Sequence, residues 1–178
     1  MAFPTFASGD VLNASDMNAV GLWLVKTHTV GTGVASVTVS DAFSSTYNNY
    51  LITLNGGTCS ADCTINLQLG SSTTGYYGFL TYGVYTGTTV LGANTNNGTA
   101  ARFIGGGSSG QMAHVRCEVL GPNAAAYTKV VGGAYQNGSN YGISNHEHRV
   151  ATAYTAFTLI PDGGTLTGGT IRVYGYRN

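Results

Sequence analysis

The sequence predicts an all-β protein: an antiparallel β-sandwich of jelly-roll or Greek-key type, preceded by a short N-terminal arm with a helix. Apolar and polar residues alternate in many short segments, which is the period of a strand with one buried face. Clusters of glycine, asparagine, serine and threonine separate these segments at intervals of about 8 to 15 residues. No long segment has the helical period, and this excludes folds built on a parallel sheet.

About nine or ten strands are expected from this pattern. The expected strands cover residues 24–30, 34–39, 50–54, 64–69, 76–85, 100–104, 112–120, 128–135, 156–160 and 170–176. Three polar or glycine-rich stretches, at residues 86–99, 105–110 and 136–148, are expected to be loops at the ends of the sandwich.

Residues 1–23 differ from the rest and are predicted to be an attachment arm, with the β-sandwich domain at residues 24–178. Ser15 can cap a short helix over residues 15–20, and Gly21 can end it after about two turns. So short a helix is not stable alone, and it must dock on this domain, a neighbouring copy or another protein. The residues predicted to attach the arm are its apolar side chains: Phe6, Val11, Leu12, Met17, Val20 and Trp23.

Charge content and the length of apolar runs exclude two classes of partner. Charged residues are only 8% of the chain, and 7 Lys and Arg balance 7 Asp and Glu. Nucleic-acid binding needs clustered basic residues, so no nucleic-acid partner is expected. No apolar run approaches the roughly 20 residues of a membrane-spanning helix, so no membrane insertion is expected. A near-neutral surface promotes association, which favours a protein that works inside an assembly.

Neither a metal nor a cofactor is predicted. The cysteines, Cys59, Cys63 and Cys117, are interpreted as free thiols in or beside the core, although Cys59 and Cys63 could touch across a tight loop. No set of cysteines and histidines has zinc-finger spacing.

No constellation of residues indicates catalysis, and the protein is not expected to be an enzyme. Most of the carboxylates lie in turn or cap contexts, where bonds to the backbone explain them. Glu118 shares the polar face of its strand with Arg116 and His114, an arrangement typical of ion pairing. A glycoside hydrolase would need two carboxylates at a shared site, and no such pair is visible.

The densest polar cluster is His146-Glu147-His148-Arg149. In an extended segment both histidines point to one face. The main interpretation is a plain loop or strand edge. Metal binding, which requires a further ligand, and a pH-sensitive interface between copies are the alternatives.

The stretches rich in tyrosine, asparagine and glycine are the best binding candidates, because tyrosine offers contact area at low entropic cost and asparagine offers adaptable hydrogen bonds. One group comprises Tyr76, Tyr77, Tyr82 and Tyr85. The other is predicted to be a loop that contacts a ligand or partner, through Tyr135, Asn137, Asn140, Tyr141, His146 and His148.

Both ends of the chain resemble bacteriophage virion proteins of the tail-fibre, tail or head-fibre type. The resemblance is carried by Phe-Ala-Ser-Gly-Asp-Val-Leu-Asn-Ala-Ser-Asp-Met-Asn at residues 6–18 and by Gly-Gly-Thr-Ile-Arg-Val-Tyr-Gly-Tyr-Arg at residues 168–177. It implies that the arm attaches the protein to other virion proteins, that the sandwich projects, and that the protein is a homotrimer.

The expected function is therefore that of a structural protein of a bacteriophage particle, assembled in the host cytoplasm. It would be displayed on the tail or fibre apparatus and contribute to host attachment by contacting a surface glycan or protein. Two alternatives stay open: a capsid decoration or head-fibre protein that stabilises the shell, and a free carbohydrate-binding module.

Overall fold

The computed structural model describes residues 8–9, 11 and 21–176 of the 178-residue chain. The described residues form a single sheet system of 13 strands, in which every pairing between strands is antiparallel. The strands are β1 (Leu22–Thr29), β2 (Val37–Val39), β3 (Asn49–Cys59), β4 (Cys63–Leu69), β5 (Tyr76–Val84), β6 (Val90–Gly98), β7 (Ala101–Gly107), β8 (Met112–Leu120), β9 (Thr128–Asn137), β10 (Asn140–His148), β11 (Phe157–Pro161), β12 (Leu166–Thr167) and β13 (Thr170–Tyr176). The all-β, antiparallel prediction is confirmed.

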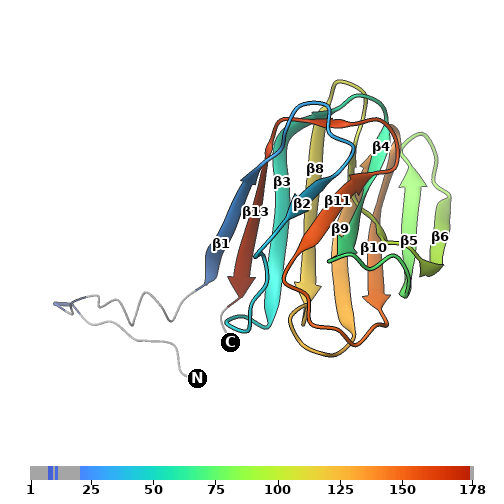
Figure 1. Cartoon of the computed structure of the whole chain (residues 1–178). Coiled ribbons are helices and arrows are strands. Elements are labelled where there is room, and N and C mark those ends of the chain that lie inside the picture. The colour runs from blue at the N-terminus through green and yellow to red at the C-terminus, as the bar shows by residue number, and fades with distance from the viewer. Residues whose placement is uncertain (1–7, 10, 12–20, 177–178) are drawn as a thin grey trace.

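The strands are arranged in two facing layers (Figure 1). The larger layer runs in the order β1-β13-β3-β8-β9-β10-β5-β6, and β12 also pairs with β3. The smaller layer runs β2-β11-β4-β7. Pairing of β7 with β8 connects the two layers at one side. Two sequence-adjacent hairpins, β5–β6 and β9–β10, thus extend the larger layer beyond β8.

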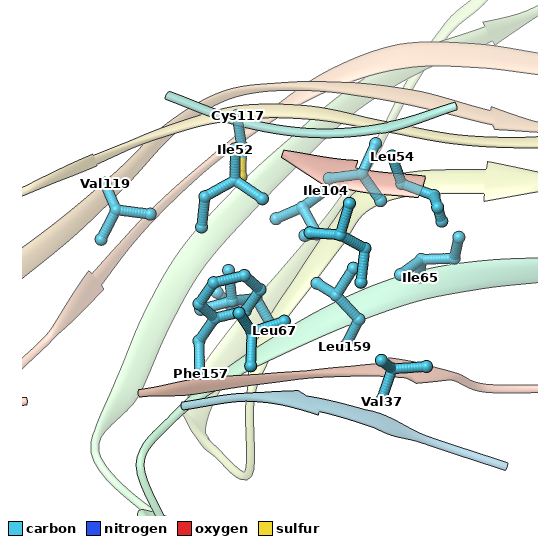
Figure 2. Packing of buried hydrophobic residues seen from close by; sticks show 14 of the residues in the cluster. Val37, Ile52, Leu54, Ile65, Leu67, Ile104, Cys117, Val119, Phe157 and Leu159 are labelled. Atoms are coloured by element: carbon cyan, nitrogen blue, oxygen red, sulfur yellow. The ribbon is translucent and has the colours of Figure 1, made fainter. Parts of the chain in front are cut away.

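The core lies between the layers, as Figure 2 shows. From the smaller layer come Ile65, Leu67, Phe157 and Leu159, all fully buried. They face a second set from the larger layer: Ile52, Leu54, Cys117 and Val119. Alternate residues of β3 and β8 are buried, so the residues between them lie on the outer face of the larger layer.

The three predicted loops are largely strands, and that part of the prediction is wrong. Most of residues 86–99 forms β6, residues 105–107 complete β7, and residues 140–148 form β10. The strands β6 and β10 lack the apolar face by which strands are predicted, and hydrogen bonds to neighbouring strands stabilise them. In β7 glycine is required, because a Cβ at Gly105 would collide with the carbonyl oxygen of His114 on β8.

No helix occurs among the described residues. The short helix predicted over residues 15–20 lies outside them, as do Phe6, Leu12, Met17 and Val20 of the predicted arm. Nowhere in the described ranges is there a helix of the length and apolarity needed to cross a membrane.

Candidate binding face

A row of side chains crosses the outer face of the larger layer. The backbone register pairs Leu51 with Glu118, Glu118 with Val131, Val131 with Asn145, Asn145 with Phe79, and Phe79 with Asn94. Residues directly opposite each other in an antiparallel pair lie on the same face of the sheet. The row, which we call the outer row, therefore brings side chains from β3, β8, β9, β10, β5 and β6 into one line.

Two adjoining depressions open along the outer row. The first has a volume of about 290 Å³ and is lined by side chains that include Leu51, Arg116 and Glu118. The second has a volume of about 410 Å³, and Val131 lines both. The polar and aromatic residues that line the second depression are Tyr77, Phe79, Lys129, Asn145, His146, Glu147 and Arg149. Its size is within the usual range of small-ligand sites.

Phe79 is the most exposed aromatic side chain of the second depression, with 54% of its surface accessible. A glycine on the neighbouring strand sets its position: a Cβ at Gly92 would lie 2.5 Å from Cζ of Phe79. The ring therefore lies over the bare backbone of β6. Exposed asparagines, Asn145 and Asn94, flank it on the two adjacent strands.

Asn145 is held by an irregularity in the β9–β10 pairing. The register shifts between Ser144 and Asn145, and Gly132 on the opposing strand has a φ of 72°. Such a bulge uses glycine because side chains disfavour the left-handed region. The backbone N–H of Gly132 donates to Oδ1 of Asn145 at 3.2 Å. This bond occupies the carbonyl oxygen of the amide and leaves its Nδ2 group to donate to a ligand.

The charged groups of the face are arranged in pairs. Nε of Arg149 donates to Oε1 of Glu147 at 2.7 Å, and the guanidinium lies 4.9 Å from the ring centre of Tyr77. Lys129 is the backbone partner of Glu147 on β9. At the first depression, the hydroxyl of Tyr176 donates to Oε1 of Glu118 at 2.6 Å. Burial and this carboxylate raise the pKa of Tyr176 to about 12.

Behind the second depression lie the two histidines, both buried on the inner face, which confirms that they share a face. His148 stacks on Tyr76 with ring centres 4.2 Å apart, and its Nε2 is 2.7 Å from the hydroxyl of Tyr154. Nε2 of His146 lies 3.3 Å from both Oγ1 of Thr95 and the backbone N–H of Arg102. Burial, with a smaller contribution from the Arg102 charge, lowers the pKa of His146 to about 4.

The predicted ligand loop is a β-hairpin, and the side chains of Tyr135 and Asn137 lie outside the described ones; the others are divided between two faces. Tyr141, half exposed, lies on the outer face two residues from Ile143 and four from Asn145. Asn140 begins β10, and Tyr135 and Asn137 belong to β9. The side chains of His146 and His148 are instead buried on the inner face of the larger layer.

Of the residues of the predicted arm, Val11 is exposed, and Trp23 belongs to β1, where it pairs with Gly175.

Sequence reasoning missed Phe79, Asn145, Lys129 and Glu147 as members of one surface. Phe79 and Tyr77 alternate in a tyrosine-rich strand, and that alternation was the only available signal. The positions of Lys129 on β9 and Asn94 on β6 beside Phe79 and Asn145 depend on the register between strands.

In the part of the chain that the structure describes, no group of three or more His, Cys, Asp or Glu residues could hold a metal ion. The arrangement offers stacking and hydrogen bonding to a bound molecule.

Comparison with known proteins found no matching family model and no matching curated protein. Among solved structures, one described as "CBM4 structure and function" has 14% identity and a TM-score of 0.22, covering 80% of this chain and 82% of that one. The VP2 subviral particle of infectious bursal disease virus has 11% identity and a TM-score of 0.16, and the alignment spans only 41% of that chain. Likeness at this level carries no argument about function.

Proposed function

We propose that the protein is a non-catalytic binding protein that holds a glycan on the outer face of its larger layer. The observation that carries the proposal is the outer row, where the exposed ring of Phe79 lies between Asn145 and Asn94 beside a depression of about 410 Å³. Sugars present apolar C–H faces and many hydroxyl groups. An aromatic ring flanked by amides and charged groups matches both features.

The polar groups of the second depression fit hydroxyl ligands better than they fit a reaction. Glu147 is occupied by Arg149 at 2.7 Å, so it is held as an acceptor with fixed geometry. Lys129, which pairs with Glu147 across the strands, and the amide of Asn145 supply donors to the same depression. A second aromatic side chain, Tyr141, continues the same face along β10 and lengthens the surface available to a chain of sugars.

We infer that the scaffold is a jelly roll with two inserted hairpins. Without the hairpins and the two-residue strand β12, the layers reduce to β1-β13-β3-β8 and β2-β11-β4-β7. In sequence order these are the first, eighth, third and sixth strands facing the second, seventh, fourth and fifth. That order is the double Greek key of a jelly roll. The inserted hairpins, β5–β6 and β9–β10, carry most of the binding face.

The proposed setting is a bacteriophage particle, where the protein acts as a structural component on the tail or fibre apparatus. The resemblance of residues 6–18 and 168–177 to virion proteins supports this setting, with the arm as the attachment to other virion proteins. Host attachment would then use the sheet face rather than loops. Many weakly binding copies on one particle would act together through avidity. A capsid decoration protein and a free carbohydrate-binding module are the alternatives.

We also propose that copies of the chain associate, as in the expected homotrimer. Large apolar side chains remain exposed on the β5–β6 hairpin: Val90 and Tyr85 are each 72% accessible. Exposed apolar patches of this kind mark interaction surfaces. The β6 strand beside them ends the larger layer and contains no charged residue.

The proposed function is tested by screening the full-length protein against immobilised bacterial surface polysaccharides and plant glycans. We expect binding to at least one glycan, and Phe79→Ala should weaken it about two- to tenfold, because a well-placed aromatic contact contributes about 0.5–1.5 kcal/mol. Tyr127→Ala is the matched control, since Tyr127 is 55% exposed but lies outside both depressions. Equal binding by wild type and Phe79→Ala would contradict the site, and absence of any glycan binding would contradict the function.

A further inference from the structure

Two cysteine side chains meet where the chain passes from one layer to the other. Cys59 ends β3 in the larger layer, and Cys63 begins β4 in the smaller layer. Their sulfur atoms are 2.7 Å apart, and both side chains are buried. A disulfide bond has a sulfur–sulfur length of about 2.05 Å, so only a small movement separates the two thiols from a covalent bond.

The surrounding structure makes room for the sulfur atoms. Gly107 on β7 is the backbone partner of Cys63, and a Cβ at this glycine would lie 2.8 Å from Sγ of Cys59. Any other residue at position 107 would therefore force the side chain of Cys59 to shift. The glycine keeps open the space in which the two sulfurs face each other.

Hydrogen bonds fix the short connection between the two cysteines. Oδ1 of Asp62 accepts the backbone N–H of Ser109 at 2.9 Å, and Oγ of Ser60 accepts the backbone N–H of Thr165 at 2.8 Å. The residues between Cys59 and Cys63 are thus tied to two other segments. The sulfur atoms stay aligned because the turn that carries them is anchored on both sides.

We propose that Cys59 and Cys63 are a disulfide-forming site that joins the two layers when the protein meets an oxidising environment. In the reaction with a low-molecular-weight disulfide, the thiolate of one cysteine attacks the disulfide and releases one thiol. The other cysteine then attacks the mixed disulfide, forms the Cys59–Cys63 bond and releases a second thiol. Two protein thiols are oxidised and the small disulfide is reduced to two thiols.

The raised pKa of the two thiols controls how fast the Cys59–Cys63 disulfide forms. Burial raises the pKa of both thiols, the carboxylate of Asp162 raises both further, and that of Asp62 also raises the pKa of Cys59. Few thiolates are therefore present in the folded protein at neutral pH, and exchange is slow because the thiolate is the reactive form. The bond should form readily during oxidative folding and more slowly in the folded, reduced protein. Cys117 lies opposite Ile52 in the core and stays a thiol.

The test is to refold the full-length chain with a mixture of oxidised and reduced glutathione, and in parallel with dithiothreitol. We expect the oxidised sample to lose two hydrogen atoms in intact mass and to retain one of its 3 thiols for alkylation after denaturation. Cleavage on the N-terminal side of Asp62 should leave the fragments that contain Cys59 and Cys63 joined until reductant is added. The oxidised sample should also melt at a higher temperature.

Two variants complete the experiment. Cys117→Ala should still lose two hydrogen atoms, whereas Cys59→Ser should not. Retention of all thiols in the oxidised wild type, or a cross-link that involves Cys117 or a second chain, would overturn the proposal. If Cys59→Ser does not fold, the fragment map of the wild-type protein decides the question alone.

Discussion

Individual side chains explain why the binding face is held in one geometry. Phe79 lies over Gly92, Asn145 is tied to the bulge at Gly132, and Glu147 is tied to Arg149. These three groups thus each have a neighbour that restricts their rotation. A face whose groups are positioned before binding loses less conformational entropy when the ligand arrives.

The buried histidine behind the face makes stability depend on pH. The pKa of His146 is lowered from 6.5 to about 4, so the unfolded chain binds more protons than the folded chain between these values. Stability should be complete above pH 6.5 and should fall as the pH drops towards 4, by roughly 3 kcal/mol from this residue. Urea unfolding across this range measures the loss.

The matched variants for the pH prediction are His146→Gln and His28→Gln. The first should remove a large part of the loss, and the second, on the edge strand β1, should retain it. If the pH profile of His146→Gln equals that of wild type, the prediction is wrong. Direct titration of the His146 ring by NMR in the wild-type protein gives an independent answer if the variant does not fold.

Among the strands, β6 has the most consequence for assembly. It ends the larger layer, contains no charged residue and carries Val90 with 72% of its surface exposed. Natural edge strands commonly use lysine or proline to prevent pairing with other chains. The absence of such residues from β6 favours pairing between copies.

Val90→Lys should therefore shift the protein towards the monomer, because a charge at this edge opposes contact with a second copy. Sedimentation velocity at several concentrations measures the change. Leu24→Lys is the control, since Leu24 is 55% exposed on β1 at the opposite end of the layer. An unchanged distribution for Val90→Lys, or an equal change for Leu24→Lys, would contradict the proposed contact.

The strands that could be predicted from sequence are those with one apolar face. Residues 64–69 and 112–120 alternate between polar and apolar and became β4 and β8 within about one residue of the expected bounds. The polar strands β6 and β10 could not be predicted, because the side chains that they bury, Thr95, Ser144, His146 and His148, are polar. Phe79, Val131 and Asn145 come together only through register, which a single sequence does not encode locally.

At the scale of the whole molecule, the described residues from β1 to β13 form one two-layer domain. The strand β1 begins at Leu22 and pairs with β13 along its length. The predicted boundary between residues 23 and 24 falls within β1, whose Leu22 and Trp23 pair with Tyr176 and Gly175. The proposed division of labour is attachment by the preceding residues and glycan binding by the layered domain.

Deletion of residues 1–21 should leave a folded domain with unchanged glycan affinity that no longer joins virus particles. The strand β1 keeps all its partners in this variant, whereas deletion of residues 1–23 removes Leu22 and Trp23 from the β1–β13 pairing. Circular dichroism, a glycan titration and particle incorporation in infected cells measure the three properties. Normal incorporation of the 1–21 deletion would contradict the attachment role of the arm.

The central claim is that a glycan binds across the strands of the outer face. It is tested most directly by mapping backbone amide shifts by NMR while the glycan selected by the screen is added. The account predicts that the largest shifts occur at Phe79, Asn94, Lys129 and Asn145, on four neighbouring strands of the larger layer. Shifts confined to the connections at the ends of the layers, or to the smaller layer, would contradict it.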